Sequence, residues 1–336
     1  MLLNKIPGRV YLLVATAIFA ASSSVGSKLA GIGMENLIEG RNPISFCNVL
    51  FIGNLCALLV LTAVYGREWQ GSSFTRLSPL NWLILITVAI LSGALAPSLT
   101  FLALENTNAS NVVLISRIQS PLTFAFLSLI LGRKGNRWMF VGELVSVAGI
   151  ILILILQSSP TNTVEMMGLN IGKGELQAIG GALAISVANV TRKVRLDMIP
   201  IGVFTIFRLA VGTVVFWGLT VKLYGMEHFA DAFIPFVWQW VSIYGVLIVA
   251  GGQIIWFKGL KMSDFSSISY AGYLTPIAGI LAAFLILGET PTTAQYIGGS
   301  VILLGAFFNQ VGIWQETKKF PSRKLNLDRF IGFKGI

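Results

Sequence analysis

Two arginines, Arg117 and Arg208, lie in the middle of apolar stretches that are long enough to cross a lipid bilayer. At a rise of 1.5 Å per residue, each lies roughly 12–14 Å from the start of its stretch, near the membrane centre. An arginine at the centre of a membrane helix costs about 2.5–3.5 kcal/mol, so we expect neither side chain to face lipid. A guanidinium that faces a watery cavity can bind the carboxylate or phosphate of a solute. The pair therefore predicts a substrate-binding site for an anionic group.

The same arginines also admit a structural role. Each guanidinium could donate hydrogen bonds to carbonyl groups that a kinked helix leaves free, or it could pair with Glu143. Glu143 is the one acidic residue that we place inside an apolar stretch, about five residues or 8 Å from its start. It could therefore lie at the membrane interface, and a proton-coupling role would require access to the cavity. The sequence leaves these alternatives open.

Two prolines, Pro121 and Pro276, interrupt two of the apolar stretches. Proline lacks an amide donor and clashes with the preceding turn, so each helix should bend there and leave carbonyl groups free. Polar residues precede both breaks: Gln119 follows Arg117 in one stretch, and Tyr273 and Thr275 occur in the other. We expect these residues to line the site, with the alternative that the prolines only shape the helices.

Small residues are concentrated in two further stretches, Ala20 to Ser27 and Gly180 to Ala188. Small side chains let membrane helices approach closely, so packing is one role for these stretches. Ser24 and Asn189, which occupy roughly corresponding places, are candidates to line the cavity.

The composition excludes a water-soluble globule. The 336 residues are 55% hydrophobic and 11% charged, with a mean hydropathy of +0.79, whereas soluble domains carry about 25% charged residues. Apolar blocks of about 20 residues satisfy their backbone hydrogen bonds as helices, whereas barrel strands would alternate apolar and polar residues. Cys47 and Cys56 point to opposite faces of one predicted helix, and His228 is the single histidine, so we expect no metal site. The sequence has no phosphate-binding loop motif, and no cofactor is predicted.

We predict ten transmembrane helices in an all-α polytopic membrane protein. The predicted spans are about 10–32, 44–65, 79–103, 109–131, 138–156, 175–194, 199–223, 235–257, 265–287 and 293–314.

The chain also resembles itself at an offset of 156 residues, without a gap. The matching pairs include Trp82 and Trp238, Phe101 and Phe257, Leu104 and Leu260, Ser110 and Ser266, Gly142 and Gly298, and Gly149 and Gly305. Each copy holds five predicted spans, and an odd number turns the second copy upside down relative to the first. Inverted repeats within a membrane are typical of transporters, whose binding sites lie between the repeats.

Basic residues predict the orientation. With a cytoplasmic N-terminus, and leaving aside Lys28, Arg117 and Arg208 within the spans, eighteen lysines and arginines fall on the inside and three, namely Arg41, Lys173 and Lys222, fall on the outside. This asymmetry predicts that both termini are cytoplasmic. The expected organisation is a first five-helix repeat at 1–157, an external linker at 158–173, a second repeat at 174–314 and a basic cytoplasmic tail at 315–336. The tail could contact anionic lipid, and we expect no nucleic-acid partner.

These features resemble the drug/metabolite transporter superfamily, specifically its EamA family. The resemblance rests on Phe101-Leu102-Ala103-Leu104 and its partner Phe257-Lys258-Gly259-Leu260, on Phe207-Arg208-Leu209-Ala210, and on Leu287-Gly288-Glu289. It covers the chain to about residue 314 and implies two inverted five-helix EamA-type repeats and solute transport. The first repeat departs from the pattern, with Arg133 where the family often has glutamate and Phe51 where the counterpart of Arg208 would fall.

The function that we predict is secondary transport of a small metabolite, anionic or zwitterionic, across the cell (inner or plasma) membrane by alternating access. The site would lie near the midplane, between the repeats. The alternatives are a membrane sensor or scaffold that retains the transporter fold, and a membrane-embedded enzyme. With one histidine and one intramembrane acid, the sequence offers few residues for catalysis, so we do not predict an enzyme. A homodimer is left open beside a monomer.

Overall fold

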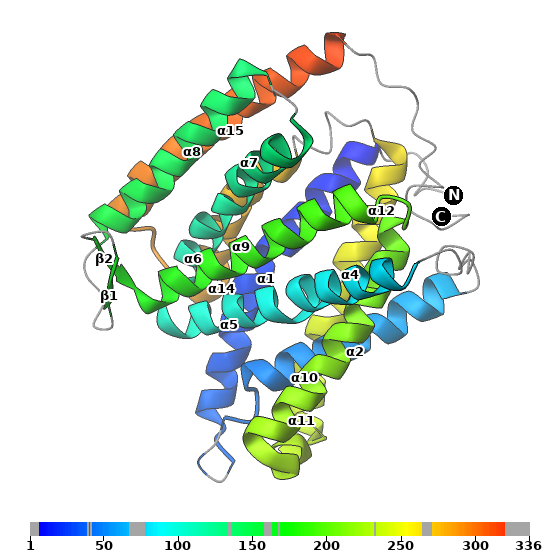
Figure 1. Cartoon of the computed structure of the whole chain (residues 1–336). Helices are drawn as coiled ribbons and strands as arrows, with labels where there is room; N and C mark the ends of the chain where they lie inside the picture. Colours follow the sequence, from blue (N-terminus) through cyan, green and yellow to red (C-terminus); the bar gives the residue numbers. More distant parts are fainter. Residues whose placement is uncertain are drawn as a thin grey trace.

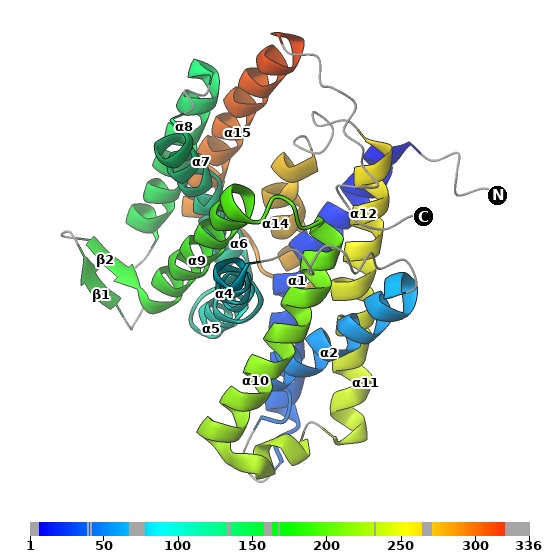
Figure 2. The same cartoon turned by 45° about the vertical axis from the view of Figure 1, so that its right-hand side comes forward.

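The computed structural model describes residues 7–38, 40, 42–66, 78–132, 136–157, 163–166, 169–231, 233–263 and 271–319. These residues form a bundle of long helices with one small β-hairpin at its edge (Figures 1 and 2).

The first half of the chain is helical throughout its described part. Its elements are α1 (Gly8–Glu35), α2 (Phe46–Tyr65), α4 (Pro79–Ile90), the π-helical segment η3 (Leu91–Leu95), α5 (Ala96–Asn106), α6 (Ala109–Ile115), the 3₁₀ turn η4 (Ser116–Ile118), α7 (Gln119–Leu131) and α8 (Arg137–Leu156). The segments α4, η3 and α5 form one continuous helix, because the π segment changes the hydrogen-bond pattern without ending the helix.

The second half opens with two strands, β1 (Thr163–Met166) and β2 (Leu169–Gly172). Its helices are α9 (Lys173–Arg195), α10 (Ile201–Asp231), α11 (Pro235–Ile243), the π-helical segment η5 (Tyr244–Gly251), α12 (Gly252–Met262), α14 (Thr275–Leu287) and α15 (Thr293–Lys319). Gly225, with φ of +78°, kinks α10 near its end.

Eight helices of the described chain are long and apolar enough to cross a membrane, which makes this a multi-pass helical membrane protein. They are Gly8–Glu35, Phe46–Tyr65, Pro79–Asn106, Ala109–Ile130, Arg137–Leu156, Ile201–Leu219, Pro235–Met262 and Thr293–Glu316. The sixth predicted span corresponds to α9, which is not among the eight and carries charged residues at both ends. Of the ninth predicted span, 265–270 lies outside the described residues, and the rest includes the 13-residue helix α14.

Local signals explain where several helices begin and end. The hydroxyl of Ser78 accepts a hydrogen bond from the amide of Asn81, and Pro79 takes the first helical position of α4. At the other end of a helix, Gly132 closes α7 and Gly288 closes α14, with φ of +61° and +70°. A residue that ends a helix in the left-handed backbone conformation is usually glycine, because glycine has no Cβ to clash. The two glycines lie 156 residues apart, so the same cap recurs at the repeat offset.

The helices α8 and α15 lie side by side and run along one edge of the molecule in both views (Figures 1 and 2). Glycines set this contact: a Cβ on Gly142 would lie 2.6 Å from the carbonyl oxygen of Gly305, and one on Gly149 would lie 2.7 Å from that of Gly298. Both distances are too short for a side chain, so the backbones themselves touch, as in close membrane helix pairs.

The remaining helices pack across the two halves in a reciprocal way. α1 contacts α12 and α14 of the second half, while α9 contacts α5 and α7 of the first. α2 packs on η5 and α10 packs on η3, and α2 and α10 also contact each other. The core therefore consists mainly of contacts between halves rather than within them.

The hairpin is a departure from the all-α prediction. β1 pairs with β2 in antiparallel register, with Thr163 opposite Gly172 and Val164 opposite Ile171. β-branched residues at these places favour extended backbone. The hairpin lies within the segment 158–173, which the sequence predicts as an external linker.

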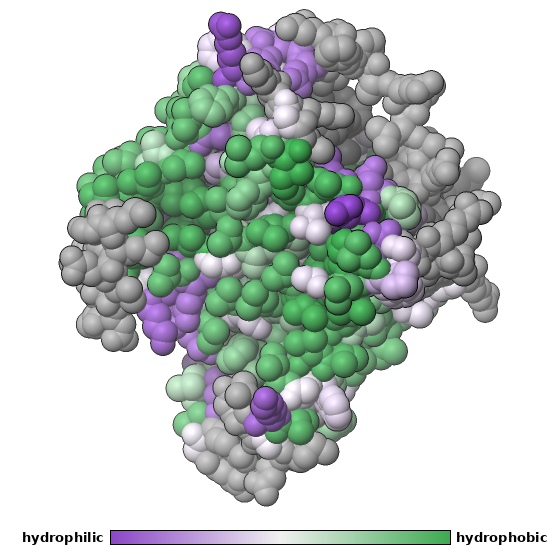
Figure 3. All heavy atoms as spheres, in the orientation of Figure 1, coloured by the Kyte–Doolittle hydropathy of each residue, from purple (hydrophilic) through white to green (hydrophobic). Residues whose placement is uncertain are grey.

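The outer surface fits a membrane location. Large apolar side chains are exposed on many helices, for example Leu129 at 79% and Leu285 at 70%. Figure 3 shows that hydrophobic residues dominate one face of the molecule, with hydrophilic residues gathered near its upper end and in smaller patches. In water such a surface would aggregate, whereas in lipid it is solvated.

Candidate functional site

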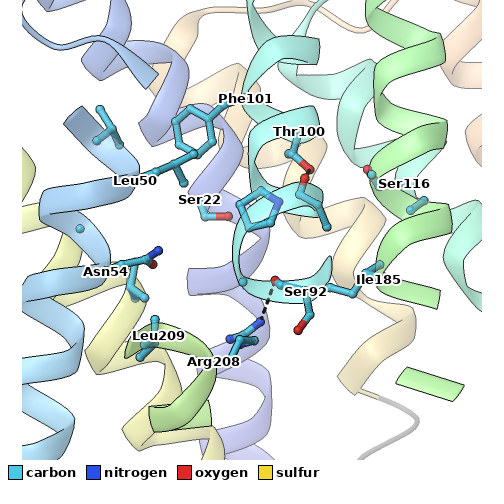
Figure 4. Close-up of a pocket in the computed structure, with 18 of the residues that line it drawn as sticks. Ser22, Leu50, Asn54, Ser92, Thr100, Phe101, Ser116, Ile185, Arg208 and Leu209 are labelled. Carbon is cyan, nitrogen blue, oxygen red and sulfur yellow. Dashed lines mark hydrogen bonds between the residues drawn. The ribbon is translucent and has the colours of Figure 1, made fainter. Parts of the chain in front are cut away.

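A cavity of about 280 Å³, here the central cavity, lies among helices of both halves (Figure 4). Its polar lining residues are Ser22, Asn54, Ser92, Thr100, Ser116, Gln119, Arg208 and Tyr244. They come from α1, α2, η3, α5, η4, α7, α10 and η5. Apolar residues such as Phe101, Ile185 and Leu209 complete the wall, so the cavity combines an apolar body with a few polar groups, as small-molecule sites do.

Arg208 is the one cationic residue that lines the central cavity. Its Nη1 donates a hydrogen bond of 3.5 Å to the carbonyl oxygen of Ser92, which Figure 4 marks as a dashed line. Gly93 makes this approach feasible, because a Cβ there would lie 2.8 Å from Cγ of Arg208 and 2.7 Å from its carbonyl oxygen. A single long hydrogen bond leaves most of the five guanidinium donors available to a ligand.

The π-helical segments lie on the wall of this cavity, η3 with Ser92 and Gly93 and η5 with Tyr244 and Val249. Shifted by 156 residues, η3 falls within η5, so the two halves carry this rare element at the same place. π segments within α-helices are frequent at functional sites. Sequence reasoning did not find them, because no residue type specifies a π segment as proline specifies a kink.

A second cavity lies beside the first. Two overlapping pockets of about 390 Å³ and 220 Å³ share Arg117, Ser120, Glu143, Tyr273 and Asn309, and we treat them together as the second cavity. Asn189 lines the larger pocket and Pro276 the smaller. This cavity therefore brings together five of the predicted site residues: Arg117, Gln119, Asn189, Tyr273 and Pro276.

Arg117 lies in the 3₁₀ turn between α6 and α7, four residues before Pro121 of α7. Its Nη1 donates to the carbonyl oxygen of Gly272 at 3.4 Å, and its Nε is buried without a hydrogen-bond partner. The guanidinium thus binds a carbonyl near the break that precedes α14, as the structural alternative anticipated, while part of it stays unsatisfied.

Glu143 is the acidic partner in this cavity, and its exposed fraction is only 7%. Its Oε1 accepts hydrogen bonds from Ser120 Oγ, at 2.9 Å, and from Asn309 Nδ2. Both donors are neutral, and the hydrogen bond of Arg117 goes to Gly272. The two opposite charges therefore line one cavity without a direct contact between them. Glu143 of α8 is therefore buried against α7 and α15.

The turn that carries Arg117 joins the two cavities. Ser116 and Gln119 line both the central cavity and the second cavity. The backbone of this turn is held from one side, because Ser186 Oγ of α9 donates to the carbonyl oxygen of Gln119 at 3.1 Å. A movement of the turn would therefore change both cavities together.

The other predicted site residues lie apart from these walls. Ser24 is fully buried, and its hydroxyl has no hydrogen-bond partner. Thr275 donates its hydroxyl at 2.7 Å to the carbonyl oxygen of Gly272, the same acceptor that Arg117 uses. Neither residue lines the central or the second cavity.

A buried polar cluster, which we call the end cluster, lies where α9 begins. Glu175 Oε1 accepts hydrogen bonds from Thr107 Oγ1, from Gln157 Nε2 at 3.0 Å and from Asn111 Nδ2 at 3.4 Å. Gln295 Nε2 donates to Asn111 Oδ1 at 2.6 Å and so adds α15 to the cluster. These bonds tie together helix ends from both halves, and sequence reasoning missed them because each residue is an ordinary polar residue at a span end.

Metal ligands are not gathered anywhere in the residues that the structure describes: no group of three or more His, Cys, Asp and Glu side chains is placed to hold an ion. Cys47 and Cys56 are both buried as free thiols.

Comparison with known proteins gives a consistent picture. Residues 8–155 and 172–310 each match the model of the EamA-like transporter family. The chain is 39% identical over 341 residues to an uncharacterized transporter of Synechocystis sp., an alignment that covers 99% of this chain and 97% of that protein. It is 24% identical to an uncharacterized transporter of Archaeoglobus fulgidus, with 88% of this chain and 95% of that protein covered.

Among solved structures, one crystal structure of a protein matches 94% of this chain and 98% of its own length, with a TM-score of 0.57 and 16% sequence identity. At that identity the likeness concerns the fold alone.

Proposed function

Because the chain belongs to the EamA-like transporter family, we propose that it is a secondary transporter that moves a small anionic or zwitterionic metabolite by alternating access. The binding site in this proposal is the central cavity, extended through the Ser116–Gln119 turn into the second cavity. Secondary transporters place their sites near the midplane between two halves, which fits a cavity lined by both.

The observation that carries the proposal is the state of the two buried arginines. Arg208 and Arg117 line the central and second cavities, and each has one long hydrogen bond to a backbone carbonyl. Placing two guanidinium groups at these depths costs roughly 5–7 kcal/mol on insertion scales. An anion that forms paired hydrogen bonds with one of these groups would offset part of that cost, because guanidinium and carboxylate form a bidentate pair.

An inverted-repeat architecture with ten spans is part of the proposal. Gly142 and Gly149 of α8 correspond to Gly298 and Gly305 of α15 at the 156-residue offset. Their contacts are crossed, with Gly142 against Gly305 and Gly149 against Gly298. A two-fold axis between two antiparallel elements requires this crossing, since each residue meets the counterpart of its partner. The repeats would span 1–157 and 174–314, with 158–173 as an external linker.

The end cluster supports a closed state at one end of the cavities. If the positive-inside asymmetry sets the orientation, α9 begins outside, and Glu175 with its partners seals the outer end. The termini would then be cytoplasmic in a cell membrane, and the basic tail, most of which lies outside the described residues, would contact anionic lipid.

Two measurements test this function. A thermal-shift screen of anionic and zwitterionic metabolites on the purified protein identifies a solute, since a ligand at 100 times its dissociation constant adds about 2.7 kcal/mol of stability. Flux of that solute into liposomes then separates a transporter from a sensor or scaffold, which would bind without flux.

Variants of the arginines test the site itself. Arg117→Gln and Arg208→Gln should each lower solute affinity at least tenfold while the protein stays monodisperse. Arg117→Lys should recover little if binding is bidentate, because an ammonium lacks the planar fork. Lys28→Gln is the matched control, because this exposed cation of α1 lies outside both cavities. Normal binding and flux in both glutamine variants would refute the anion site.

A further inference from the structure

The second cavity contains a buried acid for which solute binding alone gives no role. Glu143 is 7% exposed and lies within the membrane span Arg137–Leu156. Its hydrogen bonds come from a hydroxyl and an amide, both neutral, and both reach the same oxygen, Oε1. An acid that is buried without a directly bound cation is strongly disfavoured as an anion and takes up a proton when one is accessible.

The elements packed around Glu143 bring one further charged side chain into its cavity within the described chain. The 3₁₀ turn contributes Arg117 and the segment before α14 contributes Tyr273, and both line the same pockets as the carboxylate. α7 contributes Ser120 and α15 contributes Asn309, which are neutral. On its own helix the nearest charge is Arg137, six residues away and so roughly 9 Å along the axis. Arg117 is therefore the one permanent charge that shares the cavity with Glu143 in the described chain.

We propose that Glu143 is a proton-binding site, and that its carboxylate and the anionic group of the solute compete for Arg117. The arrangement that supports this is one cavity with a partly unsatisfied guanidinium on one wall and a carboxylate on another. When Glu143 is ionised, the cavity contains one positive and one negative charge. When an anion binds Arg117, Glu143 takes a proton from the water, and the net charge of the cavity is again zero.

The consequence is that proton and anion bind together. This step rests on the proposed function, whereas proton binding at Glu143 does not. One anion and one proton enter as a neutral pair, which avoids an uncompensated charge at the membrane centre. The Ser116–Gln119 turn would pass the change on, because Arg117 lies on the same turn as two residues of the central cavity. This site would therefore move one proton and one anion together across the membrane in the same direction.

The experiment uses protons as the only ligand and needs no known solute. Infrared spectra of the full-length protein in liposomes are recorded at acidic and alkaline pH, and the carbonyl band of protonated carboxylic acids is compared. Wild-type protein should have a titrating band that Glu143→Gln lacks. Glu105→Gln is the matched control, since this exposed glutamate of α5 lines neither pocket.

A second variant separates a proton site from a merely structural carboxyl. Removing the cation in Arg117→Gln should leave the proton on Glu143 up to a more alkaline pH, because a nearby positive charge favours the carboxylate. Arg208→Gln, whose cation lies in the central cavity, should leave that titration unchanged. The absence of any titrating band assignable to Glu143, or an Arg117→Gln titration identical to wild type, would overturn the inference. Either result would leave the flux assay of transport untouched, so the two proposals fail separately.

Discussion

Glu289 and Ser110, which are 179 residues apart in sequence, are joined by two hydrogen bonds: the carboxylate accepts from the amide of Ser110 at 3.2 Å and from its hydroxyl at 3.0 Å. The other carboxylate oxygen accepts from the amide of Ala109 at 3.1 Å. From the segment that follows α14, Glu289 thus caps the first turn of α6, where the free amides and the helix dipole favour a negative charge. This gives a physical reason for the glutamate of the Leu-Gly-Glu motif.

Removal of this cap should destabilise the protein. Glu289→Ala leaves the amides of Ala109 and Ser110 without their acceptor, and we expect a loss of about 1–2 kcal/mol, as for other helix caps. Thermal unfolding in detergent, followed by tryptophan fluorescence, measures the change. Glu105→Ala removes an exposed carboxylate and should leave the melting temperature almost unchanged. Equal melting temperatures for the two variants would contradict the capping role.

The glycine contact between α8 and α15 predicts a second destabilising substitution. In Gly149→Val the side chain would meet the carbonyl oxygen of Gly298, where even a Cβ lies at 2.7 Å. Overpacking of this kind costs roughly 1–3 kcal/mol, and here it should also separate the helices. Gly218→Val is the matched control on α10, because nothing lies within 4 Å of a Cβ at that position. The comparison is made by melting temperature and size-exclusion profile.

Topology can be tested by labelling in whole cells. The two buried cysteines, Cys47 and Cys56, are first replaced, and single cysteines are introduced at positions 165 and 324. From the basic asymmetry we expect an impermeant thiol reagent to reach position 165 from outside and position 324 only after the membrane is opened. The opposite pattern would refute the cytoplasmic termini and the even number of spans.

The end cluster predicts a change in access. Glu175→Leu removes the acceptor shared by Thr107, Gln157 and Asn111, so the outer helix ends should separate more often. In the cysteine-free background, the rate at which Ala103→Cys is labelled measures this separation, since Ala103 is fully buried beside the cluster. Its labelling from outside should rise several-fold in Glu175→Leu. A cysteine at the exposed position 105 should label equally in both proteins, and an unchanged rate at 103 would argue against a gate.

Much of the architecture could be predicted because apolar length is a direct physical requirement of a bilayer. The predicted span 138–156 differs by one residue from α8, and the predicted span 79–103 falls within the helix that runs to Asn106. The family was predicted correctly from short motifs in a fixed order. Depth along a span follows from counting residues, and the position of Arg117 and Arg208 near the membrane centre stays a prediction.

The side-chain contacts between helices could not be predicted, because they depend on which face each helix turns toward its partners. Counting residues gives the depth of Glu143 but not its neighbours, because Asn309 is 166 residues away on α15. The hydrogen bonds of the end cluster likewise join residues that are 18 to 184 positions apart in the sequence. Ser24 was a reasonable candidate by depth, but its helix rotation buries it against other helices instead of a cavity. Such rotations are set by packing between halves, which one sequence does not reveal.

The π segments η3 and η5 each contain one residue more than an α-helix would use over the same rise. The extra residue would shift along the helix if one turn changed from π to α as the next turn changed from α to π, without a net loss of hydrogen bonds. Every side chain that it passes rotates by about 100° around the axis. Ser92, Gly93 and Tyr244 line the cavity, so a shift of this kind would turn them away from its surface while both ends of their helices stay fixed. The lining of the cavity would then change by torsion within a helix, without a hinge between rigid bodies.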